Sequence, residues 1–125
     1  MTEAAADDFF DGDPAAWQIQ LRILRAFEDL TDLEVRESAS QVAYRHGRTF
    51  AIVWRPGSHL HSDVPLVLSL VLREPMGSPR FKEVVKVAGD TWMHHLDLRS
   101  AAEVDDELQG WIRLAWAGAD RRVRH

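Results

Sequence analysis

The residues best suited to chemistry are two adjacent histidines, His94 and His95, in the segment TWMHHLDL. Imidazole groups bind metals and transfer protons near neutral pH. The segment has the composition of a β-strand, in which neighbouring side chains point to opposite faces of the sheet. His94 is then expected on an apolar face with Leu96, hydrogen-bonded within the core, while His95 shares a face with Asp97, whose carboxylate can orient its ring. The two histidines are not expected to bind one metal ion together.

A second group of potential ligands, His59, His61 and Asp63, occupies alternate positions in HLHSD. In an extended chain these side chains project to one side, as a site with two histidines and one carboxylate requires. The segment directly follows RPGS, which is typical of a surface loop. We favour the interpretation that these residues are solvated, and we keep them as weak candidates for a metal site.

Arginine and tyrosine side chains form a third pattern. Tyr44 and Arg48 flank the apex of an expected hairpin, Arg80 lies in GSPRF, and His95 comes late in the expected sheet. Guanidinium groups bind anions through paired hydrogen bonds. We predict that these four residues line a surface for a small anionic ligand. The simpler alternative is that the arginines are scattered over the surface, and the net charge of -5 favours it.

Catalytic signatures are missing from the sequence. The chain has no cysteine, which excludes a cysteine nucleophile, thiolate metal sites and disulfides. It contains no GxSxG motif, no phosphate-binding loop and no dinucleotide fingerprint. The sequence therefore favours a protein that is not an enzyme, and it indicates no catalytic residue and no cofactor.

The distribution of charge divides the 125 residues into three parts. We expect an acidic N-terminal tail over residues 1–13, a single domain over residues 14–118, and a basic tail over residues 119–125, which contains Arg121, Arg122 and Arg124. The longest apolar run, residues 64–72, is too short to cross a bilayer, and the acidic N-terminus differs from a signal peptide. We expect a cytoplasmic protein that does not contact a membrane.

The elements that must position these residues form an α+β fold, a mostly antiparallel sheet of four to five strands with an N-terminal and a C-terminal helix packed on it. Asp13 and Pro14 predict the start of a first helix that runs to residue 30. Gly47 predicts a hairpin turn, and residues 64–72 have the continuous apolar character of a central strand. Ser100 and Glu103 form the pattern of a capping box, which predicts that the last helix begins at Ser100.

The strands are apolar on both faces, which two helices on one side of a sheet cannot cover. Either the helices lie on opposite faces, or a second chain covers the remaining face. We expect a homodimer, because twofold assemblies are the most common oligomers.

The segments VAYRHGRTFAIVW, SPRFKEV and MHHLDLRSAAEVDDELQGWIRLAWA resemble the family catalogued as domain of unknown function 5655. The resemblance covers residues 14–118 and implies a compact helix-sheet-helix fold. Members of the family occur alone or fused to other domains, some of them nuclease-like, and the resemblance implies no defined activity. Relatives often carry histidine-histidine-aromatic-arginine where this chain has His94, His95, Leu96 and Asp97, so a basic position has become acidic here.

Three functional hypotheses follow. The first is a soluble binding or interaction module without catalytic activity, whose partner is a small anionic ligand or a protein. The second is an accessory domain for nucleic acid, in which the hairpin and tail arginines contact phosphates. The third is a metal-binding protein that uses His59, His61 and Asp63.

Overall fold

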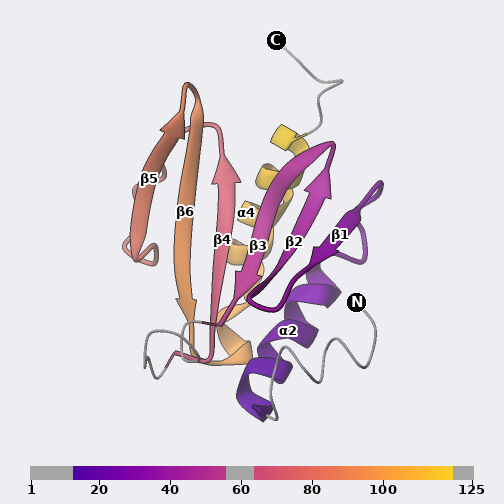
Figure 1. Ribbon diagram of the computed structural model, residues 1–125. Coiled ribbons are helices and arrows are strands. Elements are labelled where there is room, and N and C mark those ends of the chain that lie inside the picture. Colours follow the sequence, from indigo (N-terminus) through magenta and orange to yellow (C-terminus); the bar gives the residue numbers. More distant parts are fainter. Residues whose placement is uncertain (1–12, 56–63, 120–125) are drawn as a thin grey trace.

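A six-stranded antiparallel sheet and two α-helices make up the computed structural model, which describes residues 13–55 and 64–119 (Figure 1). The strands are ordered β1-β2-β3-β4-β6-β5 across the sheet. The expected α+β class with a helix at each end is confirmed. Within the described residues the strands number six where the sequence predicts four to five, and β1 is a short edge strand whose side chains are all exposed. The elements in chain order are α2 (Pro14–Ala26), β1 (Glu34–Glu37), β2 (Gln41–His46), β3 (Arg48–Trp54), β4 (Leu66–Leu72), β5 (Glu83–Ala88), β6 (Thr91–Leu98), the 3-10 turn η1 (Ala101–Glu103) and α4 (Asp106–Ala119).

Helix α2 begins where the sequence predicts. The carboxylate of Asp13 accepts hydrogen bonds from two backbone N–H groups of the first turn at 3.0 and 3.1 Å, and Pro14 occupies the first helical position. The helix was expected to reach residue 30, but it ends at Ala26. A turn follows, in which the N–H of Leu30 donates to the carbonyl of Phe27 at 3.0 Å. Phe27 and Leu30 are still buried, so the apolar stripe continues beyond the helix itself.

The centre of the sheet is formed by β4, which lies between β3 and β6. Strands β2 and β3 form a hairpin at Gly47, which has φ of 77°, a conformation that a residue with a Cβ atom rarely adopts. Strands β5 and β6 form a second hairpin at the other edge. The predictions of the first hairpin and of the central strand are confirmed. In the pairing of β4 with β6, Ser69 lies opposite His95, and Leu70 lies opposite His94.

The last helix begins later than its capping box predicts. The carboxylate of Glu103 accepts a hydrogen bond from the N–H of Ser100 at 3.0 Å, but this caps only the single turn of η1. Val104 then leaves the helical conformation, with φ of -84° and ψ of 69°. Asp105 caps α4 by accepting the N–H of Leu108 at 3.0 Å. The interruption lets the buried Val104 side chain enter the core.

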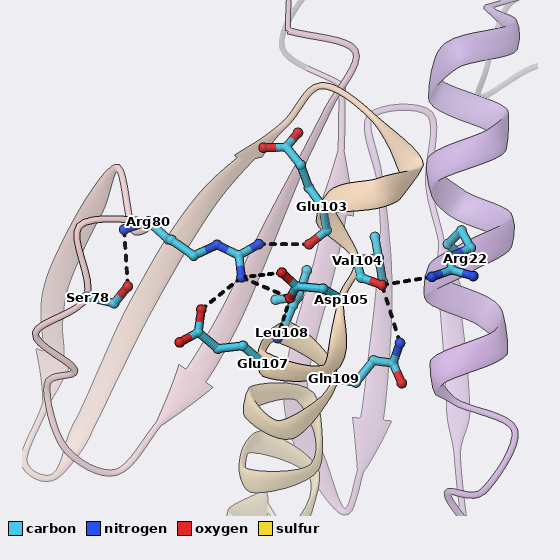
Figure 2. A network of polar contacts seen from close by, with 9 residues as sticks. All are labelled: Arg22, Ser78, Arg80, Glu103, Val104, Asp105, Glu107, Leu108 and Gln109. Carbon is cyan, nitrogen blue, oxygen red and sulfur yellow. Dashed lines mark hydrogen bonds and ion pairs between the residues drawn. The ribbon is translucent and has the colours of Figure 1, made fainter.

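The carbonyl of Val104 also joins the two helices. It accepts hydrogen bonds from Arg22 of α2 and from Gln109 of α4, both at 3.3 Å (Figure 2). These contacts hold the N-terminal end of α4 next to α2. Within the described part of the chain, neither helix is long and apolar enough to span a membrane.

Both helices lie on the same side of the sheet, behind the strands in Figure 1. The main core cluster confirms this placement, because it joins residues of α2 and α4 to the same face of β2, β3, β4 and β6. Of the two arrangements that the sequence left open, the one with helices on opposite faces does not occur. The opposite side of the sheet, which we call the helix-free face, is covered by neither α2 nor α4.

Candidate functional site

The two histidines are adjacent in β6 and point to opposite faces of the sheet. His94 is fully buried on the helix side, where its ring meets Phe81 edge to face at a centroid distance of 4.8 Å. Its Nδ1–H donates to the carbonyl of Trp92 at 3.1 Å, and its Nε2 accepts the N–H of Met76 at 3.0 Å. This arrangement requires a neutral ring, and burial lowers the pKa of His94 below its usual 6.5. The predicted core role of His94 is consistent with these contacts.

His95 lies on the helix-free face at the end of a chain of hydrogen bonds. The indole N–H of Trp54 donates to the hydroxyl of Ser69 at 3.3 Å, and this hydroxyl lies 2.7 Å from Nδ1 of His95. Because the indole can only donate, the Ser69 hydroxyl has its hydrogen available for Nδ1. We therefore expect that the neutral His95 ring carries its hydrogen on Nε2, as a donor. Strands β3, β4 and β6 together supply the hydrogen bonds that favour this tautomer.

Asp97 lies beyond His95 on the same face, and its expected role is taken by another residue. Ser69, and not Asp97, makes the hydrogen bond to the His95 ring. The carboxylate of Asp97 forms an ion pair with the largely exposed Lys82 at 3.5 Å. Its other oxygen, Oδ1, is shielded from solvent and accepts no hydrogen bond in the structure. A shielded carboxylate oxygen without a donor is unfavourable. The part-exposed Asp97 side chain can accept a further hydrogen bond at Oδ2, which faces Lys82.

Apolar side chains surround this polar centre on the helix-free face. The pairing of the strands places them on one side of the sheet, where Val85 in β5 is exposed and most of the others are half-buried, while Ala43 and Val67 are buried. Charged residues of the same face balance one another, three acidic against three basic. The apolar members are Ala43, Ile52, Trp54, Val67, Val71, Val85 and Met93, and the charged ones are Glu34, Glu83, Asp97, Arg36, Arg45 and Lys82.

Tyr44, the first of the predicted ligand-binding residues, lies in the core. Its hydroxyl accepts a hydrogen bond from the amide of Gln20 in α2 at 2.7 Å, and its ring meets Phe27 edge to face at 4.6 Å. Burial is the main reason that the pKa of Tyr44 is raised to about 12. Both Tyr44 and Gln20 are buried, so this hydroxyl does not reach a surface ligand.

Arg48 caps the C-terminal end of α4. It donates to the carbonyl oxygens of Gly118 at 3.0 Å and Ala119 at 3.2 Å, and Arg73 donates twice to Gly118 at 2.8 and 3.1 Å. Carbonyl groups at this end of a helix lack partners within the helix and carry the negative end of its dipole. Arg48 therefore supplies hydrogen bonds to the last carbonyl groups of α4.

Arg80 holds the opposite end of α4 (Figure 2). Its guanidinium group donates to the carboxylates of Asp105 and Glu107, both at 2.9 Å, and to the carbonyl of Glu103 at 2.7 Å. It also lies 5.5 Å from the ring centroid of Trp111, within range of a cation–π interaction. Hydrogen bonding to Arg80 lowers the pKa of the Asp105 carboxyl. The Arg80 guanidinium group, which was predicted to bind an anionic ligand, instead binds two carboxylates of its own chain.

The four predicted ligand-binding residues therefore do not converge. Tyr44 lies in the core, Arg48 and Arg80 lie at opposite ends of α4, and His95 lies on the helix-free face. His59, His61 and Asp63 lie outside the described residues. Within the described residues, no three histidine, cysteine, aspartate or glutamate side chains form a group that could hold a metal ion.

The family model of a domain of unknown function, DUF5655, matches residues 6–118. The chain belongs to the DUF5655 family. No curated protein and no solved structure matches the chain. The resemblance that the sequence indicates is confirmed, and the match covers α2, every strand of the sheet and all but the last residue of α4.

Ser69 is the residue of this DUF5655 domain that the sequence did not indicate as part of a site. It is the single polar residue in β4, and the sequence pattern offered no base next to it. The signal becomes clear only with the register of the sheet, which places Ser69 opposite His95. The resulting site contains the expected Nε2–H donor of His95, the carboxylate of Asp97 and apolar side chains around both. Such a surface can bind a partner with one or two specific hydrogen bonds.

Proposed function

We propose that this DUF5655 domain is a non-catalytic binding module and that its helix-free face is the binding surface. The observation that carries the proposal is the placement of both helices on one side of the sheet, which leaves an apolar face that carries His95 on β6, next to the edge strand β5. A sheet with one uncovered apolar face gains free energy when another surface covers it. Specificity would come from the His95 donor and the Asp97 carboxylate.

A catalytic role for the same face has less support. Ser69 is 2% exposed and its hydroxyl is hydrogen-bonded to both Trp54 and His95, so it cannot reach a substrate as a nucleophile. Nδ1 of His95 is used by the same hydroxyl. The remaining polar group, Nε2–H, suits recognition of an acceptor.

The nucleic-acid alternative also has less support in the described residues. Arg48 and Arg80 bind carbonyl and carboxylate groups of α4 and of the segment before it, and the charges of the helix-free face balance. Phosphate backbones are held by an excess of basic side chains on one surface. This alternative now depends on the arginines of residues 120–125, which lie outside the described residues.

A fragment screen by nuclear magnetic resonance tests the proposed binding surface. The probe is a collection of small soluble aromatic and carbonyl compounds, added to dilute isotope-labelled protein. We expect hits to shift the indole N–H signal of Trp54 and the ring signals of His95. The indole signals of Trp111 and Trp116, which belong to α4 on the other side of the sheet, serve as the control. Hits that shift only the α4 signals, or an absence of hits, would contradict the proposal.

A further inference from the structure

We infer that a second copy of this chain covers the helix-free face, in a twofold dimer that stacks the two sheets face to face. This inference rests on the proposed function, because it names the partner of the same surface. Three features of the face support the inference: its size, its balance of charge, and the complementarity of its His95 donor and its Asp97 carboxylate.

The size of the face is close to that of a standard protein interface. Six strands at a spacing of about 4.8 Å, each about 20 Å long, give a surface of about 600 Å² before the relief of the side chains is counted. A specific interface typically buries about 800 Å² of accessible surface on each partner. A copy of the same sheet has matching dimensions, and stacked sheets pack about 10 Å apart through interdigitated side chains of this kind.

The charges of the face permit two copies to approach. The whole chain carries a net charge of -5, which opposes association through an arbitrary surface. On the helix-free face, however, Glu34, Glu83 and Asp97 are balanced by Arg36, Arg45 and Lys82. The negative excess therefore lies elsewhere, and the balanced charges of this face do not repel those of a second copy.

The polar centre of the face is complementary to itself. His95 presents Nε2–H as a donor, and Asp97, two residues further along β6, has a second carboxylate oxygen, Oδ2, that lies 3.5 Å from the exposed Lys82 and can accept a further hydrogen bond. In a twofold interface each contact occurs twice, so His95 of one copy donates to the partner's Asp97 while the partner's His95 donates to Asp97 of the first. Each ring N–H and each carboxylate then gains a partner.

Sedimentation velocity over a range of concentrations tests this inference. We expect the native chain to dimerise with a Kd in the range of about 1–100 µM, as is typical of a modest interface of this size. Val71→Glu places a charge on β4, opposite Met93 on the same face, and should raise the Kd at least about 100-fold, because the charge would be buried. Leu114→Glu is the matched control, since Leu114 on α4 is 54% exposed, and it should leave the Kd unchanged.

Substitutions of His95 test the polar contact between His95 and the partner's Asp97. His95→Gln keeps a donor and should change the Kd less than about tenfold, whereas His95→Glu brings two carboxylates together and should abolish the dimer. If Val71→Glu does not fold, a dilution series of the native protein replaces it. The methyl signals of Met93 and Val71 should then shift as the dimer dissociates, and the methyl signals of Leu114 should not. A chain that stays monomeric at about 1 mM, or a dimer that Leu114→Glu alone disrupts, would overturn the inference. Fragment binding at Trp54 in such a monomer would leave the proposed binding function intact.

Discussion

Replacing Arg80 with alanine is expected to lower the free energy of unfolding by about 2–3 kcal/mol, because hydrogen bonds to charged groups are stronger than neutral ones. The side chain is only 27% exposed, and it joins the loop before β5 to η1, to the cap of α4 and to the first turn of α4. Its loss would leave the carboxylates of Asp105 and Glu107 without their cation. Chemical denaturation at pH 7, monitored by circular dichroism, measures the change.

Arg113→Ala is the control for this prediction. Arg113 on α4 makes a 3.3 Å ion pair with Asp29, and its side chain is 59% exposed. Exposed pairs contribute little, so the change should stay within about 0.5 kcal/mol. Equal effects of the two substitutions would show that Arg80 does not hold α4. Since Arg80 lowers the pKa of Asp105, its contribution should be present above pH 3.8 and be lost as the pH falls below it.

The buried His94 is expected to make the protein less stable as the pH falls below 6.5. Burial lowers the pKa of His94 in the folded state, so between that pKa and 6.5 the unfolded chain binds a proton that the folded chain does not. Its contribution to stability is complete above pH 6.5. Below that value it is lost at up to about 1.4 kcal/mol per pH unit, until the pH reaches the pKa of the folded state.

His94→Gln isolates this effect from the other histidines. Glutamine can accept the N–H of Met76 and donate to the carbonyl of Trp92, but it does not titrate. At pH 8 the variant should be less stable than the native protein by about 1–2 kcal/mol, because it loses the ring contact with Phe81. The difference should shrink as the pH falls from 6.5 to 5. Parallel stability curves for the two proteins would contradict a neutral, buried His94.

Local patterns in the sequence were enough to predict the elements. Asp13 with Pro14, and Gly47 at the hairpin, act within a few residues, and they have the predicted roles. The alternation along β6 likewise placed His94 and His95 on opposite faces. The end of α2 and the start of α4 were misplaced because Phe27 and Val104 are apolar residues that fit the helical stripe, although the chain leaves the helix at each of them.

The contacts of the candidate site could not be predicted in the same way. Arg80 reaches Asp105 across 25 positions, and Ser69 reaches His95 across 26, so both depend on the order of the strands. Tyr44 was expected at a surface because it lies near the hairpin apex, but Gln20, a polar residue in the buried stripe of α2, draws its hydroxyl into the core. The side of the sheet on which each helix packs is also a property of the whole chain. Apolar strands alone do not determine it.

The tautomers of the two adjacent histidine rings test the central claim most directly, because that claim assigns His94 to the core and His95 to the helix-free face. Long-range nitrogen–proton correlation spectra at pH 8 distinguish a ring that carries its hydrogen on Nδ1 from one that carries it on Nε2. We predict Nδ1–H for His94, which donates to Trp92, and Nε2–H for His95, which accepts from Ser69. Ser69→Ala should change the signals of His95 alone. The same tautomer in both rings, or an equal response of both to Ser69→Ala, would contradict the account.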